Sequence, residues 1–188
     1  MGFLINSFTF PVPELPITLD GTPQTESESQ SGSGETTLTV DIDVGNFTNK
    51  ALIFCMTQQS GSTTSVRVGD NDFLNMIKQQ GGDGNGSQRS EIWYLLNDGI
   101  TNNDTNTVTW TGEKGSRICI GVYSLYNVNQ GGGSNTFVAN GAFGISSGYS
   151  NQPDGEINSV GENDFILDIL SANTTTQPTD TQTAGGNI

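Results

Sequence analysis

The sequence contains no histidine and few basic residues. Its 188 residues include 6 lysines and arginines against 20 aspartates and glutamates, giving a formal net charge of −14. Without histidine, Ser–His and Cys–His nucleophile pairs, the usual base at neutral pH and most zinc sites are excluded. No lysine or arginine follows Arg117, so no basic stripe is available to neutralise phosphates. We therefore expect neither nucleic acid nor an anionic membrane as a partner, and we expect the acidity to keep the protein soluble.

Cysteine is also scarce, since Cys55 and Cys119 are the only two in the chain. Two cysteines do not make a disulfide framework. Each stands inside an apolar run, which predicts two buried free thiols that pack as small hydrophobes. A disulfide bridge across two strands is the alternative.

Long hydrophobic segments are missing as well. The first residues, Met-Gly-Phe-Leu-Ile-Asn-Ser, lack a positive region, and their apolar run is too short for a secretory signal. Asn6 stands where a myristoylation pattern requires Ser or Thr. No stretch approaches the roughly 18 apolar residues of a membrane-spanning helix. These features predict a protein that is made in the cytoplasm of a host cell.

Short apolar or alternating segments recur along the chain, and turns rich in Gly, Asn and Asp separate them. The segment 90–128 holds three of them, together with both tryptophans, and is expected to contain the densest core. The segment 73–78 fits a helical turn or a strand, and its neighbours favour the strand. The expected strands are 37–44, 51–57, 65–68, 73–78, 90–97, 107–111, 117–126, 137–139, 142–145, 155–160 and 163–170. Without any amphipathic helix pattern, this spacing predicts an all-β fold, an antiparallel β-sandwich of the jelly-roll or immunoglobulin-like kind.

The composition divides the chain into four parts. Residues 1–20 are predicted to form an extended N-terminal arm, because three prolines in six residues deny hydrogen-bond donors to a sheet and favour polyproline geometry. Residues 21–36 have the low complexity of a flexible linker. Residues 37–173 are predicted to be the β-sandwich domain, and residues 174–188 a polar C-terminal tail.

Several strings occur in a familiar order, among them Glu-Ile-Trp-Tyr-Leu at 91–95, Val-Thr-Trp-Thr-Gly at 108–112 and Asp-Phe-Ile-Leu-Asp-Ile-Leu at 164–170. Residues 37–175 resemble a β-sandwich module of bacterial surface proteins and phage virion proteins. The resemblance implies a non-catalytic domain. Members of this group continue with further strands where the present chain runs into its polar tail. An open sheet position is therefore expected, and residues 3–10 of the arm are expected to fill it, in their own subunit or a neighbour's.

Candidate sites for chemistry are weak. Loop carboxylates offer the oxygen ligands that calcium takes, and the candidates are Asp70, Asp72, Asp98 and Asp104. Their spacing fits no calcium-loop motif, and turn-capping by Asp and Asn explains it better. Carboxylate pairs such as Asp41 with Asp43 have the spacing of solvated strand faces. We therefore expect no enzyme, no cofactor and no resident metal.

These observations favour a virion structural protein of a phage, either a capsid decoration (cement) protein or an appendage component. Its expected partners are other virion proteins, the major capsid or tail proteins, and further copies of itself in a homo-oligomer, with a trimer as one guess. Docking is expected through the apolar and proline residues of the arm. These are Phe3, Leu4, Ile5, Phe8, Phe10, Pro11, Pro13 and Pro16.

Two other functions stay open. The first is a bacterial cell-surface or secreted module for carbohydrate binding or adhesion, with Tyr149 as the aromatic most expected to contact a glycan. The second is an acid-dependent glycoside hydrolase built on a carboxylate pair. Trp93 and Trp110 fit core anchors of a sandwich better than a sugar-stacking platform.

Overall fold

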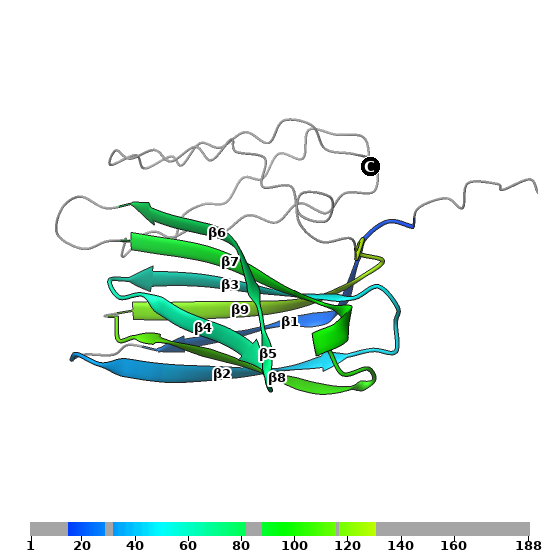
Figure 1. Cartoon of the computed structure of the whole chain (residues 1–188), viewed down its shortest axis with the longest axis horizontal. Coiled ribbons are helices and arrows are strands. Elements are labelled where there is room, and N and C mark those ends of the chain that lie inside the picture. The colour runs from blue at the N-terminus through cyan, green and yellow to red at the C-terminus, as the bar shows by residue number, and fades with distance from the viewer. Residues whose placement is uncertain (1–14, 29–31, 82–87, 116, 131–188) are drawn as a thin grey trace, which may run out of the picture.

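Two antiparallel sheets packed face to face make up the described part of the protein (Figure 1). The computed structural model describes residues 15–28, 32–81, 88–115 and 117–130. Within these ranges no helix has the length and apolar character needed to cross a membrane.

Among the described residues, the larger sheet has five strands and the smaller has four. In spatial order the larger sheet contains β1 (Thr18–Glu28), β9 (Arg117–Tyr126), β3 (Ala51–Gln59), β7 (Gln88–Leu96) and β6 (Leu74–Gly81). The smaller sheet contains β2 (Glu35–Val44), β8 (Asp104–Glu113), β4 (Thr63–Val68) and β5 (Asn71–Asp72). A 3-10 turn, η1 (Asn97–Gly99), follows β7.

The order of the strands is that of a jelly roll. Within the described residues β1 pairs with β9, β2 with β8, β3 with β7 and β4 with β5, and all of these pairs are antiparallel. The chain therefore folds as one long hairpin that is wrapped so that successive pairs alternate between the two sheets. The strand β6 adds a further antiparallel neighbour to β7. Of the two predicted sandwich types, the strand order is that of the jelly roll.

The core lies between the sheets because alternate residues of each strand point inward. In β2, Leu38, Val40, Ile42 and Val44 are buried while the residues between them are exposed. Trp110 of β8 is fully buried. Phe54 of β3 and Phe73, the residue between β5 and β6, have rings that meet edge to face with centroids 6.5 Å apart.

The larger sheet also buries apolar side chains on its other face. A second cluster includes Ile53 and Cys55 of β3, Ile92 and Tyr94 of β7, and Leu125 of β9. Burial on both faces explains why β3 and β9 read as nearly continuous apolar runs rather than alternating ones.

The all-β antiparallel sandwich predicted from the sequence is confirmed. The expected strands of the segment 90–128 correspond to β7, β8 and β9, and residues 74–81 form a strand rather than a helical turn. The expected strands at 137–139, 142–145, 155–160 and 163–170, and the predicted tail at 174–188, lie outside the described residues.

The predicted linker needs a correction, because residues 21–28 belong to β1 and pair with β9. Polar residues are tolerated there because β1 lies at the edge of the sheet that the described residues form, with most of its side chains exposed. The register shifts between Asp20 and Gln24, where Gly21 has φ +73°. Pro23 lies within this bulge, a place where a strand tolerates its missing N–H.

The sequence predicts that residues 3–10 fill an open sheet position, and the strand described beside β9 is β1. Residues 3–10 themselves lie outside the described residues.

The prediction for the cysteines is half right. Both thiols are free, and Cys55 is buried, but Cys119 is exposed. The reason is its place in β9, where Ile118 and Ile120 point into the core and Cys119 points the other way. Its neighbour on the adjacent edge strand is Ser27, which is itself exposed.

Candidate functional site

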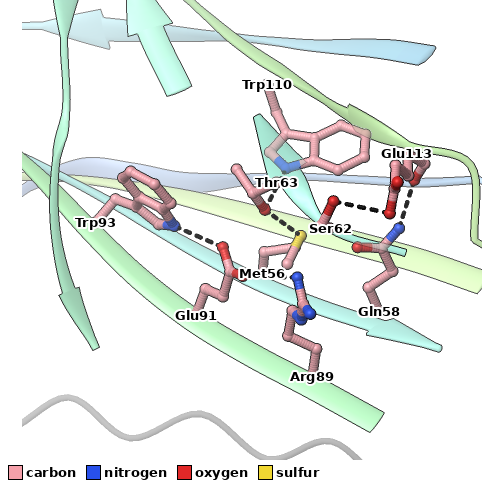
Figure 2. Close-up of polar contacts among 9 residues, drawn as sticks. All are labelled: Met56, Gln58, Ser62, Thr63, Arg89, Glu91, Trp93, Trp110 and Glu113. Atoms are coloured by element: carbon pink, nitrogen blue, oxygen red, sulfur yellow. Dashed lines mark hydrogen bonds and ion pairs between the residues drawn. The ribbon is translucent and has the colours of Figure 1, made fainter. Parts of the chain in front are cut away.

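Polar side chains enter the interior at both ends of β3. At the end of β3 lies a group that we call the glutamate cluster, comprising Gln58, Arg89, Glu91 and Trp93 (Figure 2). At its start lies a second group, the lysine cluster, comprising Asp20, Lys50, Asn102 and Ser124.

The glutamate cluster exists because β7 places polar residues at inward positions. Glu91 and Trp93 share the face on which Leu95 joins the core, and Glu91 is fully buried. The indole Nε1 of Trp93 donates to Oε2 of Glu91 at 2.9 Å, and Nη1 of Arg89 lies 3.6 Å from Oε1 of the same carboxylate. Figure 2 shows Arg89 and Trp93 converging on Glu91 from the same strand.

Gln58 extends the glutamate cluster to the other sheet. Its Nε2 donates to the backbone carbonyl of Glu113 at 2.7 Å, and the Glu113 carboxylate accepts from the Ser62 hydroxyl at 2.8 Å. Nearby, Thr63 accepts from Trp110 Nε1 at 3.0 Å. These hydrogen bonds connect β3, β4 and β8, and the contacts of Glu91 with Arg89 and Trp93 lie within β7.

A groove open to solvent lies beside the glutamate cluster, with a volume of about 490 Å³. Its walls come from β4 and β5 of the smaller sheet and from Trp93 of the larger one. The lining residues are Thr64, Ser65, Val66, Arg67, Asp72, Phe73 and Trp93. The exposed Arg67 and Asp72 side chains form a two-pronged ion pair, with distances of 2.5 Å and 3.2 Å, and this hydrogen bonding raises the pKa of Arg67. The groove offers an aromatic ring together with polar and charged groups.

The lysine cluster is formed by elements from both sheets. Lys50 immediately precedes β3 and is 1% exposed, although it is a lysine. Its Nζ donates to Oδ1 of Asn102, which lies in the loop before β8. Burial lowers the pKa of Lys50, and the nearby carboxylate of Asp20 opposes this shift.

Asp20 lies in β1 opposite Ser124 of β9. Its Oδ2 accepts hydrogen bonds from the Ser124 hydroxyl at 3.1 Å and from the Gly45 N–H at 2.8 Å. The backbone of Lys50 is held as well, because Gln130 Nε2 donates to its carbonyl at 3.0 Å. The three functional groups of the lysine cluster, an amine, an amide and a carboxylate, are thus positioned by separate elements.

The residues singled out from the sequence are distributed elsewhere. Asp72 is paired with Arg67, and Asp104 accepts from the backbone N–H of Thr105 at 2.8 Å. Asp98 lies in η1. The described portion of the chain contains no group of three or more His, Cys, Asp or Glu side chains placed to hold a metal ion.

The carboxylates of the expected solvated strand face lie where the alternation places them. Asp41 and Asp43 are exposed on β2 and accept hydrogen bonds from Thr107 and Thr105 of β8, at 2.6 Å and 2.5 Å. Of the aromatic candidates, Trp110 is a core anchor as predicted, Trp93 is partly buried in the groove, and Tyr149 lies outside the described residues.

Sequence reasoning missed both clusters. The signal for the glutamate cluster was the spacing of Arg89, Glu91 and the core residue Leu95, which are separated by even numbers of residues. Since side chains alternate with period two along a strand, all three lie on one face. The signal for the lysine cluster was weaker, a lysine directly before an entirely apolar run. Nothing local points from Lys50 to Asn102.

No family model, curated protein or solved structure matches this chain.

Proposed function

We propose that the protein is a non-enzymatic structural component of a phage virion, either a capsid decoration protein or part of an appendage, that docks on other virion proteins through its N-terminal arm. The observation that carries this proposal is the jelly-roll strand order. Jelly rolls are recurrent in viral capsid proteins and in lectins. Because one fold hosts many functions, the contacts of this chain's own residues have to support the role as well.

The glutamate cluster supports a structural role. Its carboxylate is held inside the sandwich by Arg89 and Trp93, and Gln58 connects the two sheets. A carboxylate that serves catalysis must reach a substrate, whereas Glu91 is fully buried. A rigid domain with internally used polar groups is suited to assembly.

The base of the arm also supports docking. The Pro16 carbonyl accepts hydrogen bonds from Thr18 Oγ1 at 3.0 Å and from Asn127 Nδ2 at 3.1 Å, so the chain enters β1 from a fixed point. Leu15 and Leu19 are large apolar residues at this point, yet they are 64% and 37% exposed. Exposed apolar groups next to a longer apolar segment are typical of a contact surface. Residues 1–14 lie outside the described residues, so their docking remains part of the proposal.

Purified particles provide the test. We expect quantitative mass spectrometry to find this chain in a fixed ratio to the major capsid or tail protein, and electron microscopy to locate it at repeated positions. A chain lacking residues 2–14 should keep its melting temperature, because it retains β1, but should no longer bind particles that lack the protein. Equal binding of the two forms, or absence of the chain from particles, would contradict the proposal.

The groove gives specific support to one alternative, a carbohydrate-binding module. Trp93 lines this open groove together with the paired side chains of Arg67 and Asp72, so an aromatic ring lies near hydrogen-bonding groups. In that case a glycan array should give a ligand whose affinity falls in the Arg67→Ala variant. Particle binding that is unchanged in Arg67→Ala, with no glycan bound, would favour the virion role.

A further inference from the structure

The lysine cluster brings together the reactants of an acyl-transfer reaction. The Nζ of Lys50 contacts the side-chain amide of Asn102 through Oδ1. Because Oδ1 and Cγ belong to the same amide group, the amine is held beside a carbonyl carbon. Fixed proximity of two reacting groups replaces a bimolecular encounter and lowers the barrier strongly.

The backbone supports this contact from both sides. Lys50 N donates to Asn97 Oδ1 at 3.4 Å, and the Lys50 carbonyl accepts from Gln130. Asn102 belongs to the loop between η1 and β8, and the fully buried Lys50 side chain reaches it from the start of β3. The two residues therefore meet where the start of β3 lies beside the loop that leads into β8.

The environment of Lys50 favours a nucleophilic amine. Removal from water disfavours the charged form, so burial lowers the pKa of this lysine from its usual 10.5. A desolvated lysine of this kind is an activated nucleophile. The carboxylate of Asp20 acts on the same amine by its charge, and it is held in place by Ser124 and Gly45.

We propose that Lys50 and Asn102 form an isopeptide bond that joins the start of β3 covalently to the loop before β8, with Asp20 as the group that carries the proton. This inference is independent of the virion role proposed above, because it concerns the maturation of the domain itself.

The reaction needs no further reactant. The neutral amine of Lys50 attacks Cγ of Asn102, and a new bond forms between Nζ and Cγ. The bond between Cγ and Nδ2 breaks, and Nδ2 leaves with one proton from the amine, transferred through the Asp20 carboxylate. The products are a secondary amide and one molecule of ammonia, which can leave to solvent because Asn102 is exposed. No atom changes its oxidation state.

The mass of the intact chain tests the bond. We expect the purified wild-type protein to be lighter by one ammonia than its sequence requires. Trypsin cannot cleave after an acylated lysine, so digestion of the denatured chain should leave residues 1–67 uncut at Lys50 and linked to residues 90–114. A wild-type chain with its full mass that is cut after Lys50 would overturn the proposal.

A second source of ammonia loss is succinimide formation at the Asn-Gly pairs 85–86 and 140–141. That reaction leaves Lys50 open to trypsin, so the digest separates the two. The Lys50→Arg and Asn102→Ala variants should keep their full mass and lose the linked fragment. The matched variants Lys114→Arg and Asn71→Ala should retain both the lower mass and a linked fragment. Linkage that persists in Lys50→Arg would also overturn the proposal.

The role of Asp20 has its own readout. In the Asp20→Asn variant we expect a fraction of unlinked chain after purification, and its conversion should speed up as the pH rises, because only solvent base remains to take the proton from Lys50. A purely structural role predicts lower stability without this pH profile. Complete linkage in Asp20→Asn would show that Asp20 does not carry the proton.

Discussion

Two Arg–carboxylate pairs on this protein have similar chemistry but opposite surroundings. The side chains of Arg67 and Asp72 are 49% and 59% exposed, whereas those of Arg89 and Glu91 are 10% and 0% exposed. Exposed pairs contribute little because water and salt screen them. Removing one partner of a buried pair leaves the other charge in the interior, which is strongly destabilising.

We therefore expect Glu91→Gln to lower the free energy of unfolding by about 3 kcal/mol. The matched change Asp72→Asn, at the shorter but exposed pair, should leave the urea midpoint unchanged within error. Urea unfolding followed by tryptophan fluorescence measures both, and Trp93 lies close enough to Glu91 to report on it. Equal midpoints for the two variants would show that the buried pair contributes no more than the exposed one.

The two thiols should differ in reactivity in the same way. Burial raises the pKa of Cys55 to about 12, whereas Cys119 is exposed. Cys55 therefore stays a neutral thiol well below that pH, and the thiolate is the reactive form. In the native protein at about pH 8, Ellman's reagent should modify a single thiol, and Cys119→Ser should abolish this reaction. Raising the pH by about one unit should not make Cys55 reactive; rapid labelling of the Cys119→Ser variant would refute this expectation.

At the level of the strand, β8 depends on close packing around Gly112. A Cβ at this residue would collide with the Ser62 carbonyl oxygen and with the ring of Trp110. Trp110 cannot move aside easily, because it is fully buried and its Nε1 donates to Thr63. The segment before β4 can thus approach β8 only where a side chain is missing.

We expect Gly112→Ala to destabilise the protein by about 1–3 kcal/mol, the usual cost of forcing atoms into a packed site. Gly121 in β9 is the matched control, since a Cβ there would find its nearest atom, Tyr123 Cε2, at an ordinary 3.7 Å. Gly121→Ala should be neutral or slightly stabilising, because glycine weakens a strand. Thermal unfolding of both variants decides the matter, and a loss at Gly121 as large as that at Gly112 would contradict the packing argument.

For the molecule as a whole, the fold class followed from the sequence because inward positions repeat with period two. The alternating pattern of β2 reflects burial on one face, and the apolar runs of β3 and β9 reflect burial on both faces. The strand β1 was not predicted because its side chains show neither an alternating pattern nor an apolar run. Its stability comes from backbone pairing with β9, which composition does not reveal.

The candidate site could be predicted even less. Lys50 and Asn102 are brought together by the wrapping of the long hairpin, which places the start of β3 next to the loop before β8. This contact depends on strand order and register, and the local sequence around Lys50 or Asn102 predicts neither. By contrast, Glu91 and Leu95 are four residues apart. Once β7 is taken as a strand, this spacing places Glu91 on the core-facing side and so locates the glutamate cluster.

The pairing of β1 with β9 has a consequence for biosynthesis. Thr18 is opposite Tyr126, so β1 leaves the ribosome long before its partner exists. Contacts so distant in sequence form late and slow the folding of a domain. An apolar strand that stayed unpaired on the nascent chain would promote aggregation. The Thr, Gln, Ser and Glu side chains of β1 are instead well solvated while β1 is unpaired. The polar composition that makes β1 difficult to predict from the sequence thus also allows β1 to remain unpaired in water until β9 has been synthesised.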